Sequence, residues 1–135
     1  MQENRLIEKI KKSEGYVGTV YQDHLGIDTI GIGTRMPLSE AEAELILKHR
    51  LNEKISHILQ EKPIIMTLSQ ERQEVIFEMC YQLGVNGVLK FRNMWTAIEA
   101  HDFATAAAEM LNSKWHSQTP QRAEAMAREM GGIYS

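Results

Sequence analysis

One short β-type segment constrains the fold of this chain more than any other feature. Residues 16–33 combine β-branched and aromatic side chains with repeated glycines, whereas apolar residues elsewhere recur at helical spacing. Such side chains favour strands, and the glycines mark the turns between them. We therefore expect a twisted hairpin or small sheet in an α+β fold that is predominantly helical.

Helical periodicity predicts the elements on both sides of this segment. An amphipathic helix is expected over residues 3–13, ending near Gly15, and a long helix over about 39–60. The long helix begins with the capping box formed by Ser39 and Glu42. In the rear half we expect a central helix closed by Gly84 and Gly87, and three shorter helices over residues 93–100, 102–111 and 120–130.

Composition excludes several classes of protein. Charged residues make up 24% of the 135 residues and the formal net charge is −3, so no broad basic field is present to hold nucleic acid. Cys80 is the single cysteine, which excludes an intramolecular disulfide and a disulfide-stapled scaffold. The N-terminus lacks the apolar core of a signal peptide or spanning helix, so we expect a chain made in a cytoplasm without stable membrane insertion.

Cofactor sites are not expected either. The five histidines show no metal-ligand spacing, and one thiol adds no zinc site. Gly31 and Gly33 lack the third glycine and the following Lys-Ser/Thr of a phosphate-binding loop. We therefore expect neither a metal nor an organic cofactor.

Two carboxylates flank the β segment. Cleavage of a glycosidic bond requires one carboxylic acid and a second carboxylate, and Glu14 at a helix exit and Asp23 at a hairpin tip offer such a pair. The hydroxyl of Thr29, farther along the strand, can face the same place and hold a water molecule. The alternative is a solvated helix-end charge at Glu14 and an aspartate that caps its own turn, and the pattern leaves both open.

Five motifs in order, SEGY, YQDHLGIDTIGIGT, YQLG, KF and SKWHSQTPQRA, resemble the T-even phage lysozyme family, glycoside hydrolases also called muramidases. The resemblance covers nearly the whole chain. It implies a single lysozyme-like, two-lobed domain over residues 1–135. The expected parts are a small β lobe over about 14–36, a connecting helix over about 39–60, and a helical lobe over about 64–135 joined by the N-terminal helix.

The resemblance also implies the chemistry. Glu14 would be the general acid, Asp23 the second carboxylate, and Thr29 the residue that positions water. Family members usually invert configuration, which requires carboxyl groups roughly 6.5–9.5 Å apart. The expected reaction is hydrolysis of the β-1,4 bond between N-acetylmuramic acid and N-acetylglucosamine in peptidoglycan.

Four further residues are candidates for supporting roles. Arg122 matches an arginine that pairs with the family's catalytic glutamate, but a nearby cation opposes proton donation, so we expect an orienting role. Tyr81 and Gln82 match a pair that lines the family's groove, although either can equally belong to the core. Arg35 is assigned to substrate binding. Three other large aromatic residues are expected in the core: Phe91, Trp95 and Trp115.

The chain also departs from the family pattern. Larger relatives carry a histidine and an extra helical excursion after T-I-G-I-G, whereas residues 34–37 here lead directly to Ser39, so the small lobe is trimmed. Larger relatives are also often basic, so wall binding by this slightly acidic chain is expected to be weaker or delivered by a partner. We expect a monomer that waits in the host cytoplasm, reaches the glycan strands through a holin-type lesion and lyses the cell.

Two rival functions remain. A peptidoglycan-binding or virion-associated module would keep the fold for recognition with little catalysis. Membrane disruption by an amphipathic segment over residues 120–130 is less favoured, because its EAMARE stretch balances positive and negative charge.

Overall fold

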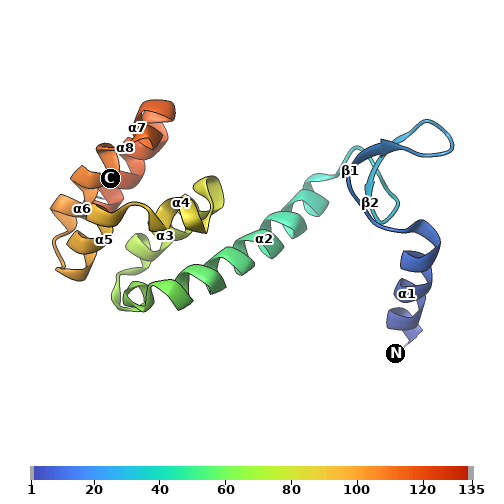
Figure 1. Cartoon of the computed structure of the whole chain (residues 1–135), viewed down its shortest axis with the longest axis horizontal. Coiled ribbons are helices and arrows are strands. Elements are labelled where there is room, and N and C mark those ends of the chain that lie inside the picture. The colour runs from blue at the N-terminus through green and yellow to red at the C-terminus, as the bar shows by residue number, and fades with distance from the viewer. Residues whose placement is uncertain (1, 134–135) are drawn as a thin grey trace. The chain divides into compact units, whose positions relative to one another are not determined.

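The computed structural model describes residues 2–133 and is predominantly helical, with one small sheet (Figure 1). This confirms the predicted α+β fold class. In chain order the elements are α1 (Gln2–Glu14), β1 (Val17–Gln22), β2 (Asp28–Gly31), β3 (Thr34–Arg35), α2 (Glu40–Glu61), a 3-10 helix η1 (Pro63–Thr67), α3 (Gln70–Leu83), α4 (Val85–Leu89), α5 (Arg92–Glu99), α6 (Phe103–Leu111), α7 (Lys114–Gln118) and α8 (Pro120–Gly131).

The chain forms two compact units, Met1–Ile46 and Leu47–Ser135. The first, the sheet unit, contains α1, the three strands and the start of α2. The second, the helical unit, contains the rest of α2 and all later helices. The prediction that the N-terminal helix joins the helical lobe stays a prediction.

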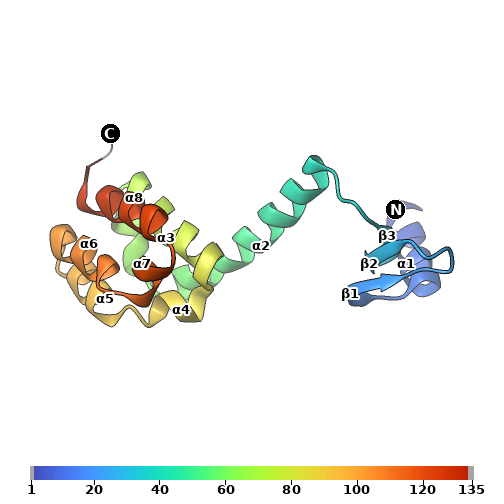
Figure 2. The same cartoon turned by 90° about the horizontal axis from the view of Figure 1, so that it is seen from above.

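The sheet is antiparallel with the order β1-β2-β3 (Figure 2). Thr29 in the central strand pairs with Tyr21 on one side and with Arg35 on the other. Helix α1 ends just before this sheet because Gly15 adopts a left-handed conformation with φ of 70°. The predicted β segment is confirmed, and its central strand carries one of the candidate residues.

Helix α2 begins with the capping box that the sequence predicts. The backbone N–H of Ser39 donates to Glu42 Oε1 at 2.9 Å, and the backbone N–H of Glu42 donates to Ser39 Oγ at 3.1 Å. The first of these bonds holds the pKa of Glu42 below its usual value. Two amides that no helical carbonyl can reach are thereby satisfied.

A continuous apolar core fills the helical unit and surrounds α3. Trp95 and Trp115 are buried, and Phe91 is half-buried with its ring edge-on to Trp115 at a centroid distance of 6.0 Å, as expected. The single cysteine also lies in this core, where burial raises the pKa of the Cys80 thiol to about 11. No helix among the described residues is long and apolar enough to cross a membrane.

The helix ends in this unit largely follow the predictions. Asp102 caps α6, and Pro120 occupies the first turn of α8. Gly84 ends α3 with φ of 79°, but Gly87 lies inside α4 and does not close α3, which corrects that prediction. Helices α4 and α7 span five residues each, too few to show a helical period in the sequence.

Candidate active site

Glu14 is the last residue of α1, and its exposed side chain lies against the turn between β2 and β3. A Cβ atom built on Gly33 would lie 2.5 Å from Glu14 Oε2 and 2.7 Å from its carboxyl carbon. Gly33 also has φ of 67°, a conformation that L-residues with side chains rarely adopt. The glycine is therefore required for the carboxyl group of Glu14 to rest where it does.

Asp23 occupies the turn between β1 and β2, and both of its carboxylate oxygens are engaged. Oδ1 accepts the backbone N–H of Leu25 at 2.8 Å and of Ile27 at 3.0 Å, and Oδ2 accepts Nε of Arg35 at 2.9 Å. The N–H of Ile27, followed by that of Leu25 and by the Arg35 guanidinium, lowers the pKa of Asp23, while partial burial opposes this shift. Asp23 is thus ionised at neutral pH. It also caps its own turn, which is the alternative that the sequence left open.

Thr29 lies in the central strand and is buried, with 2% of its surface exposed. Its Oγ1 donates to the backbone carbonyl of Ile27 at 2.8 Å. The hydroxyl donor is therefore used within the sheet, while the oxygen can still accept a hydrogen bond. The predicted contact with a water molecule stays a prediction, and it requires that the water donate to Thr29.

A three-residue segment, Gly33–Arg35, links both candidate carboxylates. Gly33 contacts the Glu14 carboxyl group, and Arg35 pairs with Asp23. Two residues of fully extended chain span at most about 7 Å, so the two contacts are anchored close together. The roles of Gly33 and of Arg35 toward Asp23 were missed from the sequence. The sequence feature that could have indicated the contact of Arg35 with Asp23 is a cation two residues after the last glycine of T-I-G-I-G.

The other candidates lie in the helical unit, where they join α3 to α7 and α8. Gln82 Oε1 accepts Nε1–H of Trp115 at 3.1 Å, and its Nε2 donates to Thr119 Oγ1 at 3.4 Å. One turn earlier on α3, Glu78 accepts Nε of Arg122 at 3.0 Å. The W-x-x-Q-T-P-x-R motif thus fastens two helices onto α3. The predicted pairing of Arg122 with Glu14 and the groove role of Gln82 stay predictions.

Tyr81 is the neighbour of Gln82 on α3, and its side chain is 39% exposed. A ring with this exposure is open to a ligand, in contrast to the buried Trp95 and Trp115. Its groove role stays a prediction.

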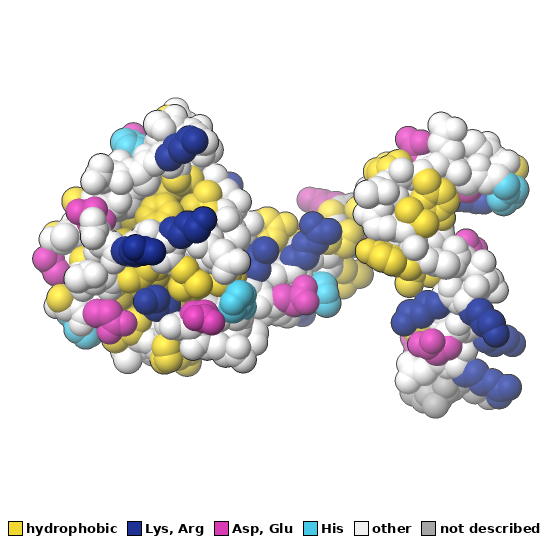
Figure 3. All heavy atoms as spheres, viewed as in Figure 1, with side chains coloured by type: hydrophobic (Ala, Val, Ile, Leu, Met, Phe, Trp, Pro, Cys, Tyr) yellow, Lys and Arg dark blue, Asp and Glu magenta, His cyan; other side chains and the backbone are white. Residues whose placement is uncertain are grey.

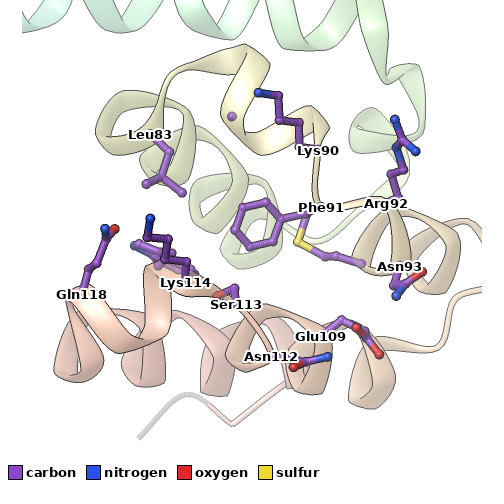
Figure 4. A pocket seen from close by; sticks show the side chains of 13 residues that line it. Leu83, Lys90, Phe91, Arg92, Asn93, Glu109, Asn112, Ser113, Lys114 and Gln118 are labelled. Carbon is purple, nitrogen blue, oxygen red and sulfur yellow. The ribbon is translucent and has the colours of Figure 1, made fainter.

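A pocket of about 370 Å³ opens on the helical unit (Figure 4). In this view the Phe91 ring lies at the centre, with Lys90 and Arg92 on one side and Lys114 and Glu109 on the other. Figure 3 shows Lys and Arg side chains gathered around a hollowed apolar area of this unit. Among residues 2–133, the three cations of the pocket take part in none of the ion pairs. We call this the cationic pocket.

Among the described residues, no group of three or more His, Cys, Asp or Glu side chains is arranged to hold a metal ion. The candidate site in the sheet unit consists of an exposed carboxyl group at a helix end and a fixed, ionised carboxylate in a turn.

A helix-end glutamate and a turn aspartate, both contacted by one short strand segment, define a two-carboxylate site on an α+β fold. The chain belongs to the phage lysozyme family, whose model matches residues 11–129. That range contains every candidate residue described above. The resemblance inferred from the sequence motifs is thereby confirmed.

The chain is similar in sequence to parts of several longer proteins. It is 44% identical over 59 residues to the "Probable T4-type lysozyme 1" of Dictyostelium discoideum, covering 44% of this chain and 35% of the relative. It is 28% identical over 149 aligned residues to the "Pre-baseplate central spike protein Gp5" of Enterobacteria phage T4, covering 87% and 26%. It is 40% identical over 52 residues to the "Peptidoglycan hydrolase gp36" of Pseudomonas phage phiKMV, covering 38% and 6%. The matched part is thus about a third or less of each relative.

Proposed function

We propose that this protein is a muramidase that hydrolyses the β-1,4 bond between N-acetylmuramic acid and N-acetylglucosamine in bacterial peptidoglycan. One observation carries the proposal: the Gly33–Arg35 segment contacts Glu14 through one end and Asp23 through the other. Two carboxyl groups with different surroundings are what glycoside hydrolysis requires. Family membership and the relatives named as lysozymes and a peptidoglycan hydrolase support it.

The two carboxyl groups divide the chemistry. Protonated Glu14 donates its proton to the glycosidic oxygen as the bond to the anomeric carbon breaks. Asp23, which is ionised at neutral pH, takes a proton from the attacking water, and that water donates its other hydrogen bond to Thr29. Both carboxyl groups then return to their starting states by proton exchange with solvent. We propose that the reaction inverts the anomeric configuration.

Glu14 has room to meet a substrate because its side chain is exposed. A glycan strand that covers this side chain would bring the glycosidic oxygen within reach of the carboxyl group. Asp23 by contrast keeps two backbone N–H donors and a guanidinium, all of which favour the charged form. These different surroundings support the acid role proposed for Glu14 and the base role proposed for Asp23.

The cationic pocket supplies wall attachment in this proposal. Lys90, Arg92 and Lys114 present three positive charges beside a single acid, Glu109, although the whole chain has a net charge of −3. Peptidoglycan carries carboxylates on its peptide stems, so charge complementarity favours contact with the wall at this pocket. This local concentration of cations compensates for the acidic balance of the chain as a whole.

The biological setting follows from the proposed activity. We propose that the protein acts in lysis of a bacterial host, remains in the host cytoplasm until a holin-type lesion opens, and works as a monomer.

Digestion of purified peptidoglycan tests the activity. We expect new reducing ends that carry muramic acid, identified by borohydride reduction and mass spectrometry. Glu14→Gln should abolish them, while Glu8→Gln, an exposed change on the same helix, should not. Release of free amino groups, reducing glucosamine ends, or nothing at all would contradict the proposal. Undiminished wall binding without release would favour the recognition module.

The stereochemical outcome needs its own measurement. NMR of the first product, recorded before the anomers equilibrate, should show the α anomer from the β-linked substrate. A β anomer, or a glycosyl group trapped on Asp23, would show instead that Asp23 acts as a nucleophile.

A further inference from the structure

The ion pair between Arg35 and Asp23 joins the end of β3 to the turn between β1 and β2. Arg35 Nε lies 2.9 Å from Asp23 Oδ2, and the Asp23 side chain is only 13% exposed whereas that of Arg35 is 51% exposed. Arg35 lies in β3 directly opposite Thr29, so the strand pairing fixes the position from which its side chain reaches the turn. The contact is therefore built into the sheet.

The hydrogen bonds to Asp23 leave one acceptor position for a water molecule. A carboxylate offers roughly four acceptor positions, two on each oxygen. The backbone N–H groups of Leu25 and Ile27 fill those of Oδ1, and Arg35 occupies one on Oδ2. The acceptor position that remains is on Oδ2, beside the guanidinium. The two backbone N–H groups thus leave Oδ2 as the oxygen that receives a proton, and Arg35 fixes the direction in which its free acceptor position points.

We propose that Arg35 is a positioning residue that orients Oδ2 of Asp23 toward the attacking water. The inference rests on the proposed muramidase function and refines it. Arg35 acts through Asp23 and does not bind the sugar in this account, in contrast to the substrate-binding role expected from the sequence.

The charges around Asp23 give this role a pH signature. Among the described residues, Arg35 is the charged group that acts on Asp23, and the other titratable groups of the hairpin are Tyr21, His24 and Asp28. Removal of the guanidinium raises the pKa of Asp23 toward its ordinary value. The deprotonated fraction at acidic pH then falls, so the acid limb of the activity profile moves to higher pH.

Three variants test the proposal. Arg35→Gln removes the charge and the ion pair, Arg35→Lys keeps the charge without the planar guanidinium, and Arg5→Gln removes an exposed cation from α1 as a matched control. Each is measured for kcat and KM on purified peptidoglycan across acidic to neutral pH. The carboxyl carbon of Asp23 is titrated by NMR in the same proteins, and circular dichroism checks the fold.

We expect Arg35→Gln to lower kcat about tenfold and to change KM by no more than about twofold. The loss of kcat is limited because the hydrogen bonds to Oδ1 still hold the Asp23 carboxylate in the turn. The acid limb of this variant and the Asp23 titration should both shift to higher pH. Arg35→Lys should restore both pH values while recovering kcat only partly, and Arg5→Gln should resemble the wild type.

The results that would overturn the positioning role of Arg35 differ from those that would contradict the muramidase function. A raised KM with unchanged kcat and an unmoved acid limb would assign Arg35 to substrate binding and overturn the proposal. An Asp23 titration that is the same with and without Arg35 would also overturn it, whether or not the protein is active. Absence of activity in the wild type would contradict the muramidase function alone.

Discussion

The carboxyl group of Glu14 rests against Gly33, at a place where a Cβ atom would lie 2.5 Å from Oε2. Gly33→Ala should therefore displace the acid and also strain a backbone with φ of 67°. Activity should fall by about 100-fold, because small displacements of catalytic groups are costly. Initial rates of reducing-end release measure the loss.

Gly31→Ala is the matched control for this change. Gly31 has φ of 74°, so the backbone strain is similar, but a Cβ atom there meets nothing within 4 Å. It should cost stability of about 1 kcal/mol with activity nearly unchanged. Equal losses of activity in both variants would show that strain, and not the contact with Glu14, explains the effect.

Gln82→Leu tests whether this residue mainly supports the helical unit. The change leaves the buried Nε1–H of Trp115 without its acceptor, which should lower the free energy of unfolding by about 1–3 kcal/mol. Urea denaturation measures this, with Gln121→Leu on the exposed surface as the control. Unchanged stability together with a raised KM would assign Gln82 to the groove.

His116 and Glu124 form a pH-dependent contact in the helical unit. The hydrogen bond between His116 Nε2 and Glu124 Oε2, 2.8 Å long, raises the pKa of His116 above its ordinary 6.5. The stabilisation is fully present below pH 6.5 and is lost as the pH rises through the folded-state value. NMR titration should show the raised pKa falling in Glu124→Gln; the same pKa in both proteins would contradict this.

The cationic pocket predicts which positive charges attach the protein to the wall. Changing Lys90, Arg92 and Lys114 to Gln in a Glu14→Gln background should weaken binding to sedimented peptidoglycan roughly tenfold in total. One exposed charge contributes at most about fivefold to the affinity, and most contribute less. The control changes three exposed cations outside the pocket to Gln: Lys48, Arg50 and Arg128. Equal weakening in both variants would mean that net charge, and not the pocket, governs attachment.

The sequence predicted the fold class because its β-type segment and helical periods are long and distinct. It predicted the capping box at Ser39 because both partners lie in adjacent sequence. It did not predict helices α4 and α7, which are shorter than two helical turns. A local sequence pattern predicts a helix or strand only where that element is long enough to repeat its period.

The candidate site was predictable in its residues but not in its contacts. Glu14 and Asp23 carry recognisable neighbours in the chain, whereas the pairing of Asp23 with Arg35 depends on strand register. Likewise, the amide of Gln82 finds Trp115 from 33 residues away, which no local pattern reports. Side-chain partners across elements require the folded backbone.

The rates of peptidoglycan hydrolysis by Glu14→Gln and Asp23→Asn show directly whether these two carboxyl groups carry the reaction. Asparagine at position 23 keeps an oxygen for the N–H groups of Leu25 and Ile27, so the turn should survive while the base is lost. We expect each variant to fold, to bind the wall and to release reducing ends at least about 1,000-fold more slowly than the wild type. Wild-type rates in either variant would contradict the proposed roles of Glu14 and Asp23.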